Sequence, residues 1–233
     1  MRILITNDDG YDAPGLDVLR QVASEFGEVV LVAPREEQSY MGHRVTTRQP
    51  LAVEHFAPGC YHVNGTPADC VRVALRGLGL EVDWVFSGVN RGGNLGSDIF
   101  TSGTIAAARE AAYLGVPAIA LSQYVAAGRE LDWRRTHAMV ARSLRILRER
   151  AAETRGAYWN VNFPHPENGV PLDHLELREC RPDTSPQDVR FERSDAGFVY
   201  CGRYQQRPRS EARDVELCFG GAITLSLLSV EHA

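Results

Sequence analysis

Short apolar runs rich in β-branched residues alternate along the chain with longer segments in which apolar residues recur every three or four positions. The short runs predict buried strands, and the longer segments predict helices with one apolar face. The strands are expected at residues 2–6, 29–33, 84–87, 117–121 and 159–163. The helices are expected at residues 16–26, 67–78, 104–114 and 132–152. Because strand and helix alternate, the pattern predicts an α/β fold with a parallel sheet.

Two parts of the chain depart from this alternation. In residues 51–63, two apolar runs flank Ala57-Pro58-Gly59, which predicts an inserted antiparallel hairpin. After Pro164 the sequence becomes rich in Pro, Asp and Arg. Further strands are expected there at residues 175–178, 197–204 and 215–228. We therefore expect a single domain, with residues 1–164 as its core and residues 165–233 as a β-rich extension.

Composition and charge exclude several classes of protein. The 233 residues are 44% hydrophobic and 24% charged, which is typical of globular proteins. A formal net charge of -5 gives no basic field for a DNA or RNA backbone, so no nucleic-acid polymer is expected as a partner. Five widely spaced cysteines without a C-x-x-C pair predict neither a disulfide framework nor a zinc site. With no leader pattern and no apolar run of about 18 residues, we expect a cytoplasmic protein that does not enter the membrane.

Two adjacent carboxylates follow the first predicted strand. Asp8 and Asp9 lie in the sequence Asn7-Asp8-Asp9-Gly10, at a carboxyl end of the sheet, where open α/β folds bind their ligands. Neighbouring carboxylates repel one another, so a site that keeps both ionised usually holds a hard divalent cation. The alternative is that the four residues only form a turn, for which their side chains are well suited.

Polar loops also follow the next two strands of the predicted sheet. The loop after residues 29–33 contains Ser39, which can ligate a metal or contact a phosphate, and His43; taken singly, both residue types are more often ordinary surface residues. The loop after residues 84–87 is rich in glycine and contains Asn90, and Ser102 and Thr104 then begin an alanine-rich helix. Free amides at a helix start attract anions such as phosphate. Together the three loops favour a site for a metal and a phosphate.

The glycine-rich loop lacks the known phosphate-binding fingerprints, and the chain contains another helix start. Neither G-x-x-x-x-G-K-[ST] nor G-x-G-x-x-G occurs in the glycine-rich loop, so a P-loop and a dinucleotide site are excluded. Thr66 and Pro67 form another helix start, which is better explained by capping than by ligand contact.

The motifs around these residues resemble those of the SurE family (survival protein E), nucleotidases that remove phosphate from nucleoside monophosphates. They occur in the family's order, from residue 3 to residue 164: I-L-I-T-N-D-D-G, A-P-G-L, V-A-P followed by a serine, G-T-P-A-D-C, S-G-V-N, N-L-G, S-G-T and N-V-N-F-P. Such a series is highly specific. Beyond residue 164 the resemblance is loose.

The resemblance implies a Rossmann-like three-layer sandwich with a parallel sheet and a β-rich C-terminal extension that takes part in oligomer formation, as a homodimer or homotetramer. It also implies one divalent cation per subunit, Mg²⁺ or Mn²⁺. The implied metal ligands are Asp8, Asp9, Ser39 and Asn90, and the two carboxylates are also the implied catalytic residues. The implied phosphate pocket consists of Asn94, Ser102, Gly103 and Thr104.

Two departures from the family pattern affect what can be carried over. Tyr40 and Met41 replace the glycine and alanine that usually follow the metal-site serine, so a base preference does not transfer. The last strands end in residues 224–228 without the family's proline, so assembly through the tail can differ.

The sequence therefore predicts a divalent-metal-dependent phosphomonoesterase, a 5'-nucleotidase that hydrolyses nucleoside monophosphates, with activity on 3' esters left open. The attacking group is water or a carboxylate of the pair; water is favoured, oriented by Asp9 or Asn90. An exopolyphosphatase and a broad-specificity acid phosphatase stay as alternatives. A nucleotide-binding regulator is a further alternative, although it would need no adjacent carboxylates. An esterase is disfavoured because no G-x-S-x-G elbow occurs.

Overall fold

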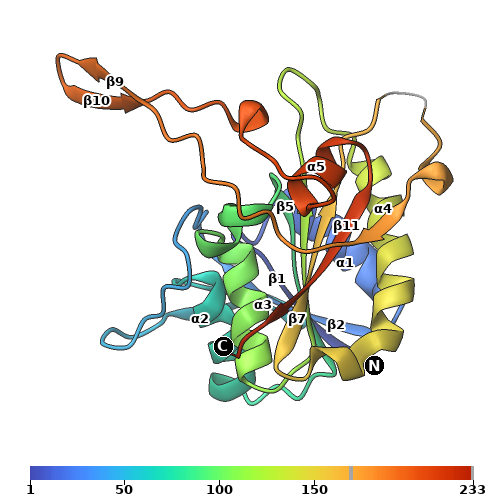
Figure 1. Ribbon diagram of the computed structural model, residues 1–233. Coiled ribbons are helices and arrows are strands. Elements are labelled where there is room, and N and C mark those ends of the chain that lie inside the picture. The colour runs from blue at the N-terminus through green and yellow to red at the C-terminus, as the bar shows by residue number, and fades with distance from the viewer. Residues whose placement is uncertain (168–169, 232–233) are drawn as a thin grey trace.

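Nine strands form one sheet and two more form a separate hairpin in residues 1–167 and 170–231, which the computed structural model describes (Figure 1). The strands of the sheet are β1 (Arg2–Thr6), β2 (Glu28–Pro34), β3 (Val53–Ala57), β4 (Cys60–Val63), β5 (Trp84–Arg91), β6 (Ala118–Gln123), β7 (Ala157–Phe163), β8 (Leu177–Glu179) and β11 (Ile223–Ser229). The hairpin consists of β9 (Phe191–Ser194) and β10 (Gly197–Tyr200). The α-helices are α1 (Pro14–Ser24), α2 (Pro67–Arg72), α3 (Gly103–Tyr113), α4 (Trp133–Leu147) and α5 (Asp214–Phe219).

The sheet is mostly parallel, with the strand order β3-β4-β2-β1-β5-β6-β7-β11-β8. Strands β4, β2, β1, β5, β6 and β7 run in the same direction. Strand β3 is antiparallel to β4, and β11 is antiparallel to β7. The structure thus confirms the predicted α/β fold, in which helices cover a parallel sheet.

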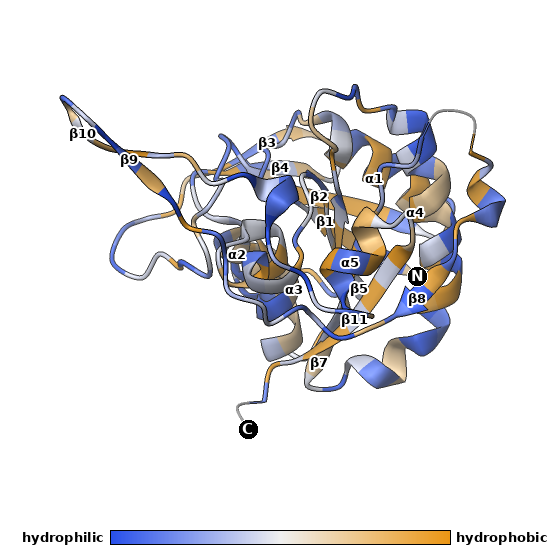
Figure 2. Ribbon diagram, turned by 45° about the horizontal axis from the view of Figure 1, so that its top comes forward, coloured by the Kyte–Doolittle hydropathy of each residue, from blue (hydrophilic) through white to orange (hydrophobic). Residues whose placement is uncertain are grey.

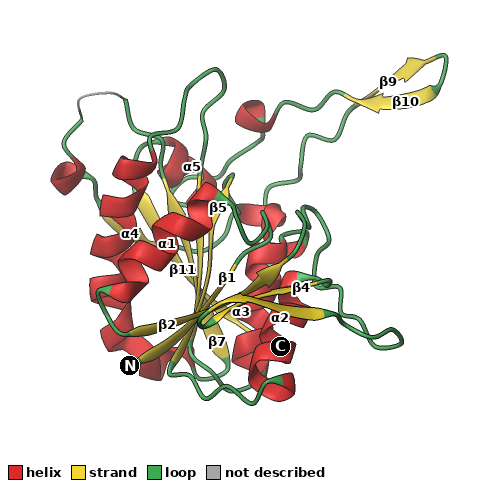
Figure 3. Cartoon of the chain, turned by 180° about the vertical axis from the view of Figure 1, so that it is seen from behind, coloured by secondary structure: helices red, strands yellow, loops and turns green. Residues whose placement is uncertain are grey.

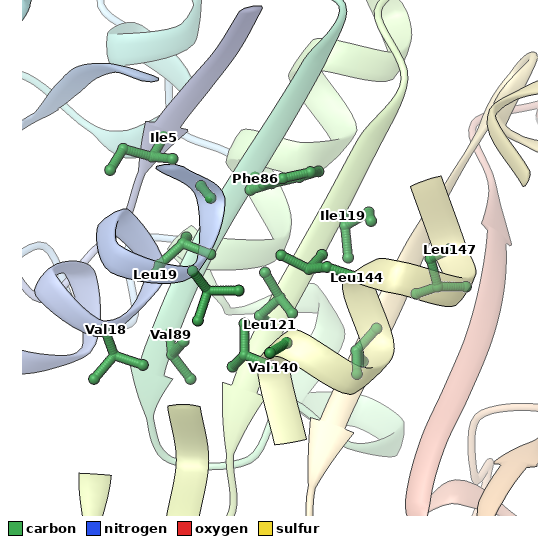
Figure 4. Packing of buried hydrophobic residues seen from close by; sticks show 14 of the residues in the cluster. Ile5, Val18, Leu19, Phe86, Val89, Ile119, Leu121, Val140, Leu144 and Leu147 are labelled. Carbon is green, nitrogen blue, oxygen red and sulfur yellow. The ribbon is translucent and has the colours of Figure 1, made fainter. Parts of the chain in front are cut away.

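Helices cover both faces of this sheet and complete a three-layer sandwich (Figure 3). Helices α1 and α4 pack on one face, where Leu19, Phe86 and Leu144 belong to one buried cluster (Figure 4). Helices α2 and α3 cover the other face, where the alanines of α3 allow close approach to the strands. Figure 2 shows hydrophobic colour along the central strands between these layers. The strands that alternate with helices along the sequence thus form the middle layer, and the helices form the two outer layers.

The two helix starts singled out in the sequence are capped as expected. Thr66 Oγ1 accepts a hydrogen bond from the N–H of Asp69, whose carboxylate accepts one from the N–H of Thr66. Ser102 Oγ accepts a hydrogen bond from the N–H of Ile105 at the start of α3. Helix α2 ends earlier than the predicted residue 78, because residues 73–77 continue as a π-helical turn.

The hairpin predicted in residues 51–63 is present, and it enlarges the main sheet. Strands β3 and β4 pair antiparallel, and β4 pairs parallel with β2. The insertion therefore extends the sheet at one edge.

The C-terminal part differs from the prediction at one element. Residues 215–228 were expected to be a strand, but residues 214–219 form α5 and the strand begins at Ile223. Val215 and Cys218, three residues apart, are both buried on one side of α5, which is helical spacing. Gly221, with φ 101°, then turns the chain into β11. In the same part, β10 ends at Tyr200, and β9 was not predicted because only Phe191 in it is apolar.

Candidate active site

The carboxyl ends of β1 and β5 meet where the order of strands reverses. The chain continues from β1 to β2 on one side and later enters β5 on the other side of β1. Open α/β sheets bind their ligands at such a switch point. Asp8 and Asp9 follow β1 after one residue, Asn7, and Asn90 is the next-to-last residue of β5. The structure therefore brings the predicted carboxylates and the predicted amide to one edge of the sheet.

Asp8 is buried, and Thr104 at the start of α3 donates hydrogen bonds to both of its oxygens. The Thr104 hydroxyl donates to Oδ1, and the Thr104 N–H donates to Oδ2 at 3.1 Å. Burial raises the pKa of Asp8 to about 6, although the Thr104 hydrogen bonds act in the opposite direction; the charge of Asp9 raises it further. Thr104 thus holds the Asp8 carboxylate in place, but little positive charge nearby stabilises its ionised form.

Asp9 connects the end of β1 to the end of β5. Its Oδ2 accepts a hydrogen bond from the N–H of Arg91 at 3.1 Å. Burial raises the pKa of Asp9, the Arg91 N–H lowers it, and the nearby charge of Glu37 raises it. Both members of the pair therefore sit in surroundings that disfavour their ionised forms, which a bound cation would reverse.

The loop after β2 reaches this edge through its main chain. The N–H of Gln38 donates to the carbonyl of Asp8 at 2.7 Å, so Ser39 follows directly after a residue bonded to the site. The Ser39 hydroxyl donates to a Glu37 carboxylate oxygen at 2.5 Å, which leaves the lone pairs of its oxygen available. Asn90 Nδ2 donates to the carbonyl of Gly92 at 2.8 Å, which leaves its side-chain oxygen as an acceptor. Ser39 and Asn90 can thus both offer oxygen to a cation.

Three of the four predicted phosphate contacts lie at the first turn of α3, next to Asp8. Ser102 caps the helix, and Thr104 is bonded to Asp8. A Cβ atom on Gly103 would lie 2.9 Å from the Cβ of Asp8, so only glycine permits this close packing. Within residues 1–167 and 170–231, the Gly103 N–H has no hydrogen-bond acceptor, whereas the next two amides of the helix do. An anion at this helix start would find that amide and the positive end of the helix dipole.

Asn94, the fourth predicted phosphate contact, lies in a buried network of hydrogen bonds. Its N–H donates to Asn162 Oδ1 at 2.7 Å, and its carbonyl accepts from Asn160 Nδ2 at 2.9 Å and Asn162 Nδ2 at 3.1 Å. Its own Nδ2 donates to Ser122 Oγ at 2.8 Å. Asn94 therefore anchors the loop after β5 to β6 and β7, while its contact with phosphate stays a prediction.

Some residues at the site were given no such role from the sequence. Asn160 and Asn162 belong to a recognised motif, and their alternation on a fully buried strand was a signal that both side chains bond to something inside the protein. Thr104 was expected to contact phosphate, yet its N–H and hydroxyl are used on Asp8. Glu37 carried no signal, because it is one of several acidic residues in a polar loop.

The donor set at the site fits a hard divalent cation. Across the two described stretches of chain, no three His, Cys, Asp or Glu side chains gather as a metal site. The set predicted from the sequence needs only two carboxylates, completed by a hydroxyl oxygen and an amide oxygen. All four donors are oxygen atoms, which suits Mg²⁺ or Mn²⁺.

A mostly parallel sheet with two carboxylates at its switch point, next to a helix start, is typical of the α/β proteins that bind their ligands at the carboxyl ends of the strands. The family described as "Survival protein SurE" matches residues 3–182. The chain belongs to the SurE family.

Relatives and a solved structure agree with this assignment. A protein of Synechocystis sp. is 41% identical over 230 residues, which cover 99% of this chain and 100% of the relative. A protein of Cereibacter sphaeroides named 5'-nucleotidase SurE is 44% identical over 243 residues, covering 97% of this chain and 92% of that protein. The crystal structure of a SurE protein from Aquifex aeolicus superposes with a TM-score of 0.84 at 27% identity, covering 100% of this chain and 95% of that one.

Proposed function

We propose that this protein is a divalent-metal-dependent 5'-nucleotidase, a phosphomonoesterase that converts nucleoside monophosphates into nucleoside and phosphate. The observation that carries the proposal is the pair Asp8 and Asp9 at the switch point, with the first turn of α3 directly against Asp8. Family membership and the names of the relatives support the same activity.

Asp8, Asp9, Ser39 and Asn90 would hold the cation. When bound, it supplies Lewis-acid chemistry that offsets charge on the phosphate as the ester bond breaks. Thr104 fixes the orientation of the Asp8 carboxylate by binding both of its oxygens. This positioning prepares the ligand set before substrate arrives.

The chain's own groups can bind and orient the phosphate. The Gly103 N–H and the dipole of α3 attract a phosphate oxygen. Ser102 at the N-cap and Asn94 in the anchored loop are the further contacts we propose. These groups would keep the phosphorus in line with the attacking group and the leaving oxygen, which is the main requirement in phosphoryl transfer.

We favour water over an aspartate as the attacking group. Both oxygens of Asp8 already accept hydrogen bonds from Thr104, so Asp8 is poorly placed to attack phosphorus. Only Oδ2 of Asp9 accepts the hydrogen bond from the Arg91 N–H. The other carboxylate oxygen, Oδ1, can orient a water molecule and accept its proton. The water oxygen then bonds to phosphorus, the ester P–O bond breaks, and the nucleoside oxygen leaves with a proton from solvent.

Cellular location and assembly complete the proposal. No helix in residues 1–167 or 170–231 has both the length and the apolar character needed to span a membrane. The five thiols are unpaired, which suits the reducing cytoplasm in which we place the protein. We further propose a homodimer or homotetramer formed through the C-terminal extension.

One assay tests the function directly. Purified protein is incubated with 5'- and 3'-nucleoside monophosphates, polyphosphate and an aryl phosphate, after EDTA treatment and after adding back Mn²⁺ or Mg²⁺. We expect phosphate release from nucleoside monophosphates only with added metal, and none from Asp8→Asn. Faster release from polyphosphate would favour the exopolyphosphatase. Nucleotide binding without phosphate release from any substrate would replace the enzyme with a regulator.

A further inference from the structure

Two large aromatic side chains beside the candidate site are left in solvent. Tyr40 is 88% exposed and Phe100 is 76% exposed, whereas most apolar side chains of the protein are covered. Tyr40 follows Ser39, and Phe100 precedes Thr101 and Ser102 at the start of α3. An exposed ring makes little contribution to packing, so both rings are available for contact with a ligand.

The segments that carry the two rings lie next to each other. The N–H of Gly42 donates to the carbonyl of Thr101 at 2.9 Å, which joins the loop after β2 to the residues before α3. His43 Nε2 lies 2.7 Å from a Glu110 carboxylate oxygen and secures the same loop to the side of α3. These two contacts fix the loop that carries Tyr40 beside the segment that carries Phe100.

Both rings are close in the chain to groups assigned to the metal and the phosphate. Consecutive Cα atoms are about 3.8 Å apart, so Tyr40 is one such step from Ser39 and Phe100 is two steps from Ser102. Both side chains are therefore within reach of the remaining part of a ligand whose phosphate lies at the start of α3.

The backbone of Tyr40 gives independent support for a role in binding. Its φ of 59° lies in the left-handed region, which strains a residue with a bulky side chain and would suit glycine. Neither burial nor backbone conformation favours tyrosine at this position. Backbone strain of this kind concentrates where a side chain is needed for function.

We propose that Tyr40 and Phe100 form the subsite for the nucleobase, on which the base of the substrate stacks. This inference rests on the proposed nucleotidase function and names the part of the site that distinguishes nucleotides from other phosphate esters. Bases stack on aromatic side chains irrespective of their hydrogen-bonding edges. Because a purine offers a larger face than a pyrimidine, purine nucleotides gain more from the subsite.

The test compares a substrate that has a base with one that lacks it. Initial rates are measured with AMP, CMP and ribose 5-phosphate for the wild type, Tyr40→Ala, Tyr40→Phe and Phe100→Ala. Alanine keeps the backbone strain at position 40 and removes only the ring. Ile146→Ala, which shortens an exposed apolar side chain of α4 on the opposite face of the sheet, is the control.

We expect Tyr40→Ala and Phe100→Ala to raise KM for AMP about 10-fold, which corresponds to about 1.4 kcal/mol. KM for CMP should rise less, KM for ribose 5-phosphate should stay unchanged, and kcat should change little. Tyr40→Phe should resemble the wild type because it keeps the aromatic face, and Ile146→Ala should resemble it because Ile146 lies on the opposite face of the sheet. Tyr40→Gly should also lose affinity for AMP, yet unfold at a higher temperature because glycine relieves the strain.

Equal changes in KM for AMP and ribose 5-phosphate would overturn the base subsite, as would unchanged KM for AMP in both alanine variants. Failure of the nucleotidase proposal itself looks different, because the wild type would then release phosphate from none of the three substrates.

Discussion

Asp8 shows how function and stability oppose each other at a single residue. Its carboxylate is buried next to Asp9, with hydrogen bonds from Thr104 but little positive charge around it. In the metal-free fold, ionisation of Asp8 is therefore unfavourable, which is the condition that a divalent cation relieves. Residues of this kind are retained for binding or catalysis at a cost in stability.

We predict that Asp8→Asn stabilises the metal-free protein while it abolishes phosphate release. The pKa of Asp8 rises on folding from 3.8 to about 6, so the fold favours the protonated form. The contribution of Asp8 to stability therefore falls as the pH rises through this interval and is lowest above it. Urea unfolding in EDTA at neutral pH should show Asp8→Asn to be more stable by up to about 3 kcal/mol, with the difference vanishing at low pH. If Asp8→Asn is less stable than the wild type at neutral pH, the charge of Asp8 is compensated in the metal-free protein and the prediction is wrong.

Thr104 gives a second prediction at the scale of residues. Thr104→Val removes the hydroxyl that donates to Asp8 Oδ1 but keeps the N–H that donates to Oδ2. We expect roughly 10-fold weaker Mn²⁺ binding, as is typical for groups that orient metal ligands. Thr104→Ser, which keeps the hydroxyl, serves as the control in the same calorimetric titration. If both variants bind Mn²⁺ like the wild type, Thr104 does not orient Asp8.

The residues that meet at the site were predictable, but several of their contacts were not. Asp8, Asp9 and Asn90 could be placed at one edge because each follows or ends a strand of a parallel sheet. That Thr104 would bond to Asp8 depends on how α3 packs against β1, which no local pattern specifies. Their roles in metal and phosphate binding are predictions that the phosphate-release assay and the Mn²⁺ titration test.

At the scale of elements, regular alternation was more informative than composition. Most strands and helices of residues 1–163 were predicted because they bury a continuous apolar face. The exposed strand β3 was predicted from the turn residues that join it to β4. Helix α5 was missed because Val215, Leu217 and Phe219 also fit a strand, and only its packing against Leu95 and Tyr124 distinguishes the two. Short amphipathic segments remain ambiguous without their tertiary contacts.

The asparagine network gives a prediction for the loop between β5 and α3. Asn162→Ala removes the acceptor for the buried N–H of Asn94 and one donor to its carbonyl. A buried N–H without a partner costs about 1–3 kcal/mol, so urea unfolding should show a loss of that size. Asn64→Ala is the matched control, because Asn64 is exposed, and it should change stability by less than about 0.5 kcal/mol. A loss no greater than that of the control would mean that water or another group satisfies Asn94.

At the scale of the whole molecule, the β9–β10 hairpin is the part that the fold does not explain. It extends away from the three layers (Figure 1) and exposes Phe191, Phe198 and Tyr200. Phe191 pairs with Tyr200 in the ladder, and Phe198 lies two residues from Tyr200, so all three project from one face. An isolated two-stranded hairpin is marginally stable in water, and an exposed apolar face marks a contact surface.

We predict that this face associates with another copy of the chain, as the expected homodimer or homotetramer requires. Phe198→Asp places a charge at the centre of the aromatic face, where burial against a partner would be costly. Sedimentation velocity should show the wild type as an oligomer and the variant shifted toward the monomer over the same concentrations. Glu192→Ala is the control, because Glu192 pairs with Val199 on the opposite face of the hairpin and should leave the distribution unchanged. If Phe198→Asp assembles like the wild type, the aromatic face lies outside the interface and another surface joins the subunits.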